Sequence, residues 1–316
     1  MAGSVTEPIS KAAERAQRML FGPFNLGKWL SLGFIAFLAQ LGEGGGYSAR
    51  LPNFRGTFPP SGGPGYGGLS HEFDEALSWA RAHQTLVLAI GTGVVVAGVL
   101  LGTLIVWLSS RGKLMFVESV LFDRHAVSEP WSRLRERAFS LFKFRMVLGL
   151  LGMTLMLPIL AAALFVALPD IRAWRFESHA WLGILILFCN FLFLGLPLTI
   201  ISLLLEDFVV PIMYLRDLAT TGAWKVLRAE ILPGNAGTIV LFYLMQFLLG
   251  LAIGLLVLFI TCLTCCLAAL PYLSSVLLLP IHVFRRGYSL YFLEELGQRV
   301  FPDLRPPPTW NEGRFG

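Results

Sequence analysis

Long apolar runs alternate with shorter amphipathic segments along the chain. Three runs contain no Asp, Glu, Lys or Arg: 85–108, 146–168 and 181–205. A fourth charge-free run, 231–284, is too long for one helix and predicts two, at 236–260 and 267–284. At about 1.5 Å per residue, each predicted helix comes close to or exceeds the roughly 30 Å of a hydrocarbon core. The pattern therefore predicts membrane-spanning helices.

A shorter apolar run at 24–41 predicts one more span, in which Lys28 extends toward the interface. A secretory signal peptide is the alternative, but the charged lead before this run is long for one. The segment that follows, 42–84, is rich in Gly and Pro over much of its length. Such a composition cannot build a core and predicts an irregular outer loop. The chain thus has six predicted spans.

A short amphipathic motif precedes each pair of spans. Residues 128–138 (SEPWSRLRERA) are repeated at 6–16 (TEPISKAAERA), and a fainter copy starts at Thr221. Each copy predicts a helix start, because a Ser or Thr can cap free N–H groups and two copies have Pro in the first turn. Apolar residues recur on one face of each predicted helix, and most charges lie on the other.

These features together predict an all-α integral membrane protein with a single domain over 1–316. Six transmembrane helices form three tandem repeats in parallel orientation, each beginning with a cytoplasmic interfacial amphipathic helix. The predicted boundaries are 6–127 for repeat 1, 128–220 for repeat 2, 221–305 for repeat 3 and 306–316 for a C-terminal tail. Trp131 and Trp224 occupy matching positions, and we expect both to anchor their helices at the head-group level.

Composition and charge agree with a membrane location. The chain is 55% hydrophobic and only 14% charged, whereas soluble domains contain about 25% charged residues. With a cytoplasmic N-terminus, the inner segments hold 20 Lys and Arg residues and the outer segments hold five. This distribution satisfies the positive-inside rule and places both termini in the cytoplasm. The inner basic residues then face anionic lipid head groups, so membrane lipid is the expected partner. Because lipid already explains these basic segments, we do not expect nucleic acid as a partner.

The segment 206–213 (EDFVVPIM), followed by Ala223, Trp224 and Leu227 before the next span, resembles a group of bacterial multi-pass membrane proteins. This group includes the membrane domain attached to some glycerophosphodiester phosphodiesterases, and related stand-alone families of unknown function. The similarity covers about 111–245. It implies a bacterial cytoplasmic (inner) membrane protein with six helices. No phosphodiesterase catalytic domain is present, so the resemblance carries over no active site.

A few polar side chains near the spans are candidates for function. Asn190 and Gln246 are the most deeply placed amides, and they predict interhelical hydrogen bonds or, alternatively, a polar transport path. Glu206 and Asp207 lie at the inner end of the fourth span and predict an ion-pair network, or a head-group or cation site. His282 is expected at the interface. No charged residue lies in the middle of a span, which disfavours ion-coupled transport.

Small residues and cysteines form the remaining patterns. Two pairs of glycines lie four residues apart: Gly98 and Gly102, and Gly250 and Gly254. This spacing allows close helix–helix approach, either inside the bundle or along the seam of a homodimer. Three cysteines gather at 262–266 (CLTCC), but no His or carboxylate is near enough to complete a zinc site. Ordinary packing or an outer disulfide are the two interpretations left open.

No recognisable catalytic motif, cofactor site or metal site is present in the sequence. The pattern favours a non-enzymatic scaffold or accessory subunit, with a second copy or another membrane protein as a possible partner. The alternative is a permease or lipid-handling protein for an apolar or lipid-like solute, and the third is a membrane enzyme. A cavity lined by Asn190, Thr199 and Gln246 would favour transport. An enzyme would need Glu206, Asp207 and His282 in one pocket.

Overall fold

Every regular element in the described part of the chain is a helix. The structure is a computed structural model, and it describes residues 5–22, 25–41, 78, 82–124, 127–173, 178–263 and 271–301. The all-helical expectation is confirmed for these residues. The tail 306–316 and most of the loop 42–84 lie outside them.

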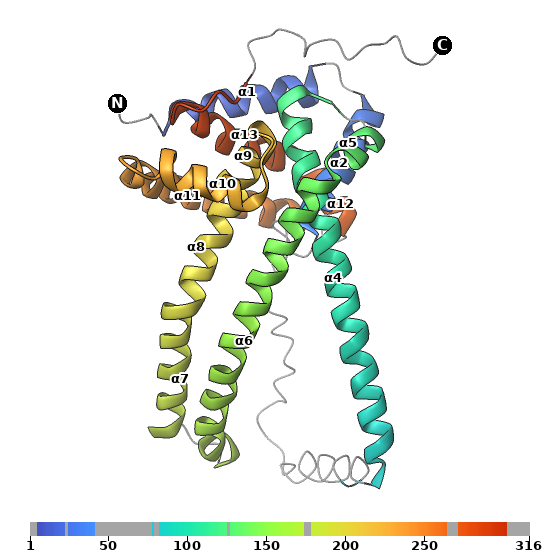
Figure 1. Cartoon of the computed structure of the whole chain (residues 1–316), viewed down its shortest axis with the longest axis vertical. Coiled ribbons are helices and arrows are strands. Elements are labelled where there is room, and N and C mark those ends of the chain that lie inside the picture. The colour runs from blue at the N-terminus through green and yellow to red at the C-terminus, as the bar shows by residue number, and fades with distance from the viewer. Residues whose placement is uncertain are drawn as a thin grey trace.

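Within those residues, four helical segments are long and apolar enough to cross a membrane: Gln84–Phe122, Arg135–Asp170, Ser178–Leu215 and Ala236–Phe259. They correspond to α4 (Gln84–Phe122), most of α6 (Arg135–Ala173), the run from α7 (Ser178–Asn190) to α9 (Val210–Leu215), and most of α11 (Ala236–Leu263). In Figure 1, α4, α6 and the α7–α8 run extend in one direction from a cluster formed by the other labelled helices, and α11 lies within that cluster. The apolar side chains of the four segments are mostly exposed, as surfaces that contact lipid must be.

The first predicted span is a short helix that buries one face against the rest of the protein and leaves Leu26, Leu30 and Phe34 exposed. Helix α2 covers Leu26–Gln40, and its Leu32, Ile35 and Ala36 are fully buried. It crosses α4 very closely, because a Cβ added at Gly112 would lie 2.4 Å from the backbone nitrogen of Ala39. Only glycine permits this approach.

The sixth predicted span, 267–284, is divided in the described residues. Helix α12 (Pro271–Leu277) ends before Leu278, and α13 (Leu279–Glu295) follows it. Residues 264–270 lie outside the described part. The count of six spans and the threefold repeat therefore stay predictions.

The repeated motif forms helices at all three places, but the predicted capping is wrong. Helix α1 (Glu7–Phe21) follows Thr6, which makes no side-chain capping bond because its backbone is already helical (φ −90°, ψ −34°). Ser128 is the first residue of α5 (Ser128–Arg133) rather than its cap. The fainter copy lies in α10 (Thr220–Val226), which starts one residue before Thr221.

The two strong copies share a different contact. Ser10 Oγ donates to the carbonyl of Glu7 (2.9 Å), and Ser132 Oγ donates to that of Glu129 (3.0 Å). These residues are equivalent in the repeat. The sequence similarity thus corresponds to a similar local structure.

The buried apolar side chains form one cluster, which includes residues of α1, α2, α13 and the C-terminal part of α4. These helices meet at one end of the molecule in Figure 1. Helix α1 packs along α13, so the beginning and the end of the described chain lie side by side. Phe242 of α11 stacks on Phe292 and Tyr288 of α13, with ring centroids 4.4 and 4.8 Å apart. Tyr288 donates to the carbonyl of Val5 (3.3 Å). Burial raises the pKa of Tyr288 to about 12, so the phenol remains a donor at physiological pH.

Candidate functional site

A cavity of about 600 Å³ lies between α6 and α8 (Leu196–Leu204), and we call it the groove. Its lining residues are Lys113, Leu141, Arg145, Leu148, Gly149, Gly152, Met153, Met156, Leu198, Thr199, Ser202, Leu203, Leu205, Glu206 and Val210. The lining residues that lie in the charge-free runs are mostly apolar, and the charged residues Lys113, Arg145 and Glu206 lie just beyond the ends of those runs. The groove is open to the side, since Met153 in its lining is 64% exposed.

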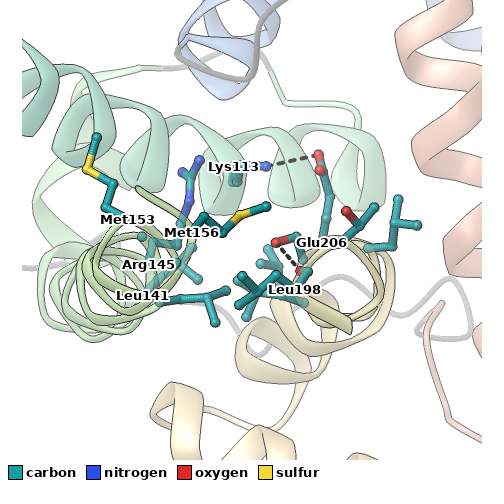
Figure 2. A pocket seen from close by; sticks show the side chains of 15 residues that line it. Lys113, Leu141, Arg145, Met153, Met156, Leu198 and Glu206 are labelled. Atoms are coloured by element: carbon teal, nitrogen blue, oxygen red, sulfur yellow. Dashed lines mark hydrogen bonds and ion pairs between the residues drawn. The ribbon is translucent and has the colours of Figure 1, made fainter. Parts of the chain in front are cut away.

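An ion pair forms part of the charged end of the groove. Lys113 Nζ of α4 lies 3.0 Å from Glu206 Oε1, and Figure 2 shows the two side chains reaching toward each other. The Lys113 side chain is 3% exposed, whereas that of Glu206 is 40% exposed. The ammonium is therefore fixed in the protein interior, and the carboxylate has access to the cavity.

Arg145 of α6 completes the charged end. Its guanidinium donates to Ser109 Oγ of α4 at 3.0 Å. Ser109 in turn donates to the carbonyl of Ala39 in α2 (3.1 Å). Three helices thus converge at this end of the groove, and their contacts orient the Arg145 guanidinium.

The backbone around Glu206 is held in an unusual way. Residues Leu205–Val209 form a π-turn (η2), in which the N–H of Val210 bonds the carbonyl of Leu205. Pro211 has no N–H to offer the next carbonyl, that of Glu206. Arg286 Nη1 of α13 donates to this carbonyl instead, at 2.7 Å. The proline of the EDFVVPIM segment thereby creates an acceptor that ties η2 to α13.

A second, smaller cavity of about 200 Å³ lies on the other side of the ion pair, and we call it the inner pocket. It shares Lys113, Leu203 and Glu206 with the groove. Its other lining residues are Ala39, Gln40, Phe116, Asp207, Gln246, His282, Arg285 and Arg286. The Nε2 atom of His282 is buried and has no hydrogen-bond partner among the described residues. Most of the residues that line the inner pocket are polar or charged.

Four of the five polar candidates from the sequence come together in the inner pocket: Glu206, Asp207, Gln246 and His282. Ser289 of α13 donates its hydroxyl to the carbonyl of Asp207, which fixes that residue against the same helix. Asn190 is elsewhere. It is buried at the end of α7, lines neither of these cavities, and its Oδ1 has no hydrogen-bond partner in the described chain.

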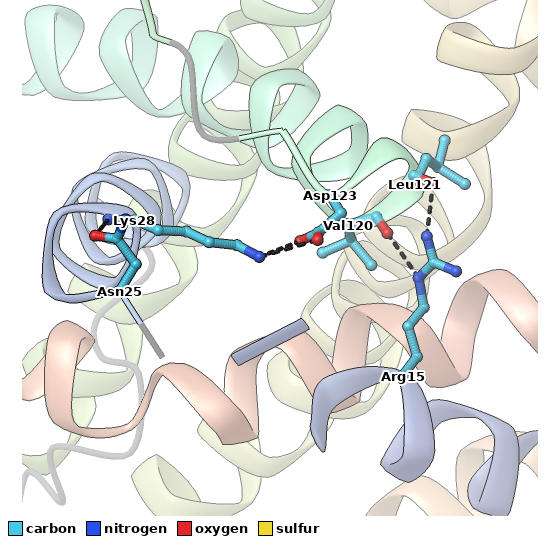
Figure 3. Close-up of polar contacts among 6 residues, drawn as sticks. All are labelled: Arg15, Asn25, Lys28, Val120, Leu121 and Asp123. Carbon is cyan, nitrogen blue, oxygen red and sulfur yellow. Dashed lines mark hydrogen bonds and ion pairs between the residues drawn. The ribbon is translucent and has the colours of Figure 1, made fainter. Parts of the chain in front are cut away.

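The C-terminal end of α4, which carries Lys113, is fixed by the two N-terminal helices (Figure 3). Arg15 of α1 donates to the carbonyls of Val120 and Leu121, at 2.8 and 2.6 Å. A cation at a helix C-terminus also interacts favourably with the helix dipole. Lys28 of α2 forms an ion pair with Asp123, 2.8 Å away. These contacts hold the helix end that positions the groove's ammonium.

The tryptophans proposed as anchors lie outside both cavities. Trp131 packs with Trp107 around the guanidinium of Arg111, which lies 4.6 Å from each ring centroid. Trp224 lies beside Phe144, and its buried Nε1 has no hydrogen-bond partner in the described part of the chain. Their role at the head-group level stays a prediction.

The described residues include both glycine pairs and part of the cysteine cluster at 262–266. Added Cβ atoms at Gly98, Gly102 and Gly254 would have no described atom within 4 Å, and Gly250 is only partly buried. The structure therefore shows no tight intramolecular packing at these three glycines. Cys265 and Cys266 lie outside the described residues. Among the residues that are described, no three His, Cys, Asp or Glu side chains form a metal-binding group.

Sequence reasoning missed Lys113, Arg145 and Arg286 as members of the site. Lys113 and Arg286 do fall in the two similar segments RGKLMFV (111–117) and RGYSLYF (286–292), which follow apolar runs. Their position directly after a span was the available signal. The sequence does not show that α4 and α13 approach η2, and this approach is what brings Lys113 and Arg286 to Glu206.

The fold and the site together define an all-helical protein with helices suited to crossing a membrane and a charged cavity at one end of them. A family described as a family of unknown function (DUF7544) matches residues 4–279, which is most of the chain. The chain belongs to this family. No curated protein and no solved structure matches it.

Proposed function

We propose that this is a lipid-handling membrane protein that holds a chain-bearing amphiphile in the groove between α6 and α8. The observation that carries the proposal is the gradient of polarity along the groove. Its apolar part lies between two membrane-crossing segments, and its charged end contains Lys113, Arg145 and Glu206. An amphiphile has the same distribution of apolar and polar groups.

The groove has the size and lining that such a ligand requires. Its volume of about 600 Å³ falls within the roughly 300–1,000 Å³ of small-molecule sites. Gly149 has no side chain, and a Cβ added there would meet no described atom within 4 Å, so this part of the α6 wall leaves room for an acyl chain. Met153 and Met156 have flexible thioether side chains that adapt to different chain shapes.

The other functional classes have less support. A scaffold or accessory subunit needs no groove, although a homo-oligomer or another membrane partner is compatible with lipid handling. An enzyme requires Glu206, Asp207 and His282 in one cavity, and the inner pocket meets that condition. We still favour a non-enzymatic role, because Glu206 is engaged in an ion pair and the carbonyls of both acidic residues are tied to α13.

We also propose the finer topology: six spans in three tandem repeats, in a bacterial cytoplasmic membrane with both termini inside. The excess of Lys and Arg in the segments assigned to the inner side supports this orientation. The matching Ser10 and Ser132 contacts support the repeat. The resemblance to membrane domains of glycerophosphodiester phosphodiesterases is compatible with the proposal. In this orientation, the charged end of the groove faces the cytoplasm and anionic lipid head groups.

Cysteine labelling tests the orientation. In a variant whose native cysteines are replaced by Ser, Ser78→Cys should react with a membrane-impermeant maleimide in intact cells. Ser132→Cys, which is equally exposed in the protein, should react only after permeabilisation. The reverse pattern would overturn the proposed orientation, and reaction of both in intact cells would place these two sites on the same outer side.

Blocking the groove tests lipid handling. Gly149→Phe should reduce the lipid that is retained after purification in mild detergent, as quantified by mass spectrometry. Gly149 lines the groove and a Cβ there meets no described atom within 4 Å, so we expect the larger side chain to take up space in the groove. Excluding about two methylene groups of a chain removes about 1.6 kcal/mol of burial. The retained lipid should then fall by about tenfold.

Gly98→Phe is the matched control. Gly98 also lies on a membrane-crossing helix, has open space around its Cβ, and does not line the groove. This variant should retain lipid like the wild type. Equal retention by all three proteins would contradict the proposal.

A further inference from the structure

The ion pair between Lys113 and Glu206 separates the groove from the inner pocket, because both residues line both cavities. The two partners are not equivalent. Lys113 is almost completely buried, and a buried ammonium without a counter-charge is strongly unfavourable. The more exposed Glu206 carboxylate can turn toward solvent. Glu206 is therefore the partner that can be replaced, provided that another anion takes its position.

The inner pocket offers further groups to such an anion. It contains three cationic side chains, Lys113, Arg285 and Arg286, against two carboxylates, Glu206 and Asp207. When Glu206 turns away, the cations outnumber the remaining carboxylate. The imidazole of His282 also lines this pocket. Arginine and lysine side chains are the usual partners of phosphate groups.

We propose that Lys113 is an exchange site, at which the anionic phosphate of the bound lipid's head group replaces the carboxylate of Glu206. The acyl chain stays in the groove, and the head group enters the inner pocket beside Arg286 and His282. This inference rests on the proposed function and specifies its ligand as an anionic phospholipid. A zwitterionic lipid supplies no net charge to replace that of Glu206, so the site discriminates against it.

The test is a gain of binding. In Glu206→Gln, Lys113 no longer has an internal carboxylate with which the lipid must compete. The affinity for phosphatidylglycerol in mixed micelles should rise by about tenfold, and that for phosphatidylcholine with the same chains should not change. Lys113→Gln should lose the preference for phosphatidylglycerol. A merely structural ion pair would give no increase in Glu206→Gln.

Two controls keep the result interpretable. Glu14→Gln removes a carboxylate from another Glu–cation pair, which is exposed on α1, and should leave both affinities unchanged. If Glu206→Gln does not fold, Glu206→Asp retracts the carboxylate by one methylene and should give a smaller increase in the affinity for phosphatidylglycerol.

Titration with inorganic phosphate distinguishes a lipid phosphate from a free phosphate as the bound anion. Weaker binding of phosphate than of phosphatidylglycerol supports the lipid, and equal binding overturns it.

The outcomes also separate this inference from the proposed function. If Gly149→Phe removes the lipid but Glu206→Gln leaves the affinity unchanged or lowers it, the groove is a lipid site and the exchange at Lys113 is wrong. If Gly149→Phe has no effect, the groove itself is not the lipid site, and the inference fails with the function on which it rests.

Discussion

Arg133→Ala is expected to destabilise the protein by about 3 kcal/mol, because it leaves the buried carboxylate of Glu118 without its counter-charge. Arg133 Nη2 lies 2.5 Å from Glu118 Oε1, and the Glu118 side chain is 3% exposed. The second carboxylate oxygen, Oε2, is buried and has no hydrogen-bond partner among the described residues. The pair also joins α5 to α4. The loss should appear as a lower unfolding temperature in detergent.

The double variant Arg133→Ala/Glu118→Gln distinguishes an unpaired charge from lost packing. A neutral amide is less costly to bury than a carboxylate, so the second substitution should recover part of the stability. Arg18→Ala is the control, because Arg18 pairs with Glu14 at 2.7 Å on the exposed surface of α1. Exposed pairs contribute about 0–1 kcal/mol. If Arg18→Ala and Arg133→Ala lowered the stability by similar amounts, burial of the Glu118 carboxylate would not be the cause of the effect.

Phe242→Ala should cost about 3–5 kcal/mol, the usual effect of removing a fully buried aromatic ring. Phe242 stacks on Phe292 and Tyr288 of α13 and contacts Phe208 of η2, 5.5 Å between ring centroids. It therefore joins α11 to the helices that carry the inner pocket. Thermal unfolding in detergent measures the effect.

Phe247→Ala is the matched control on the same helix. Phe247 is 67% exposed on a segment suited to crossing a membrane. Its removal should change the unfolding temperature little, since no protein cavity is created. A comparable loss in both variants would show that the described packing of α11 is not the source of the effect.

The sequence predicted the helical membrane architecture because hydrocarbon excludes charge. The charge-free runs 85–108, 146–168 and 181–205 all fall in segments that are long and apolar enough to span. The run 24–41 gives only a 15-residue helix, whose composition does not reveal that it is buried against α4. Gly112 explains this burial, but its role depends on the distant residue Ala39.

The candidate site was predicted in part, for a similar reason. Glu206, Asp207 and His282 were conspicuous as polar groups next to apolar runs, and the structure brings them together with Gln246. The groove was not predictable, because it depends on how α6 and α8 lie relative to each other. Lys113 lies in a basic segment after the apolar run 85–108, and this position does not reveal that its side chain is buried. Its burial beside Glu206 follows from the tertiary approach of α4 to η2.

The most direct test of the groove is photo-crosslinking in vesicles with a phosphatidylglycerol that carries a diazirine in its acyl chain. We expect the label to concentrate on groove residues of α6 and α8, such as Met153, Met156 and Leu198. Gly149→Phe should abolish this labelling. Even labelling of all lipid-facing residues, including Val94 and Val99 of α4, with no response to Gly149→Phe would contradict this expectation.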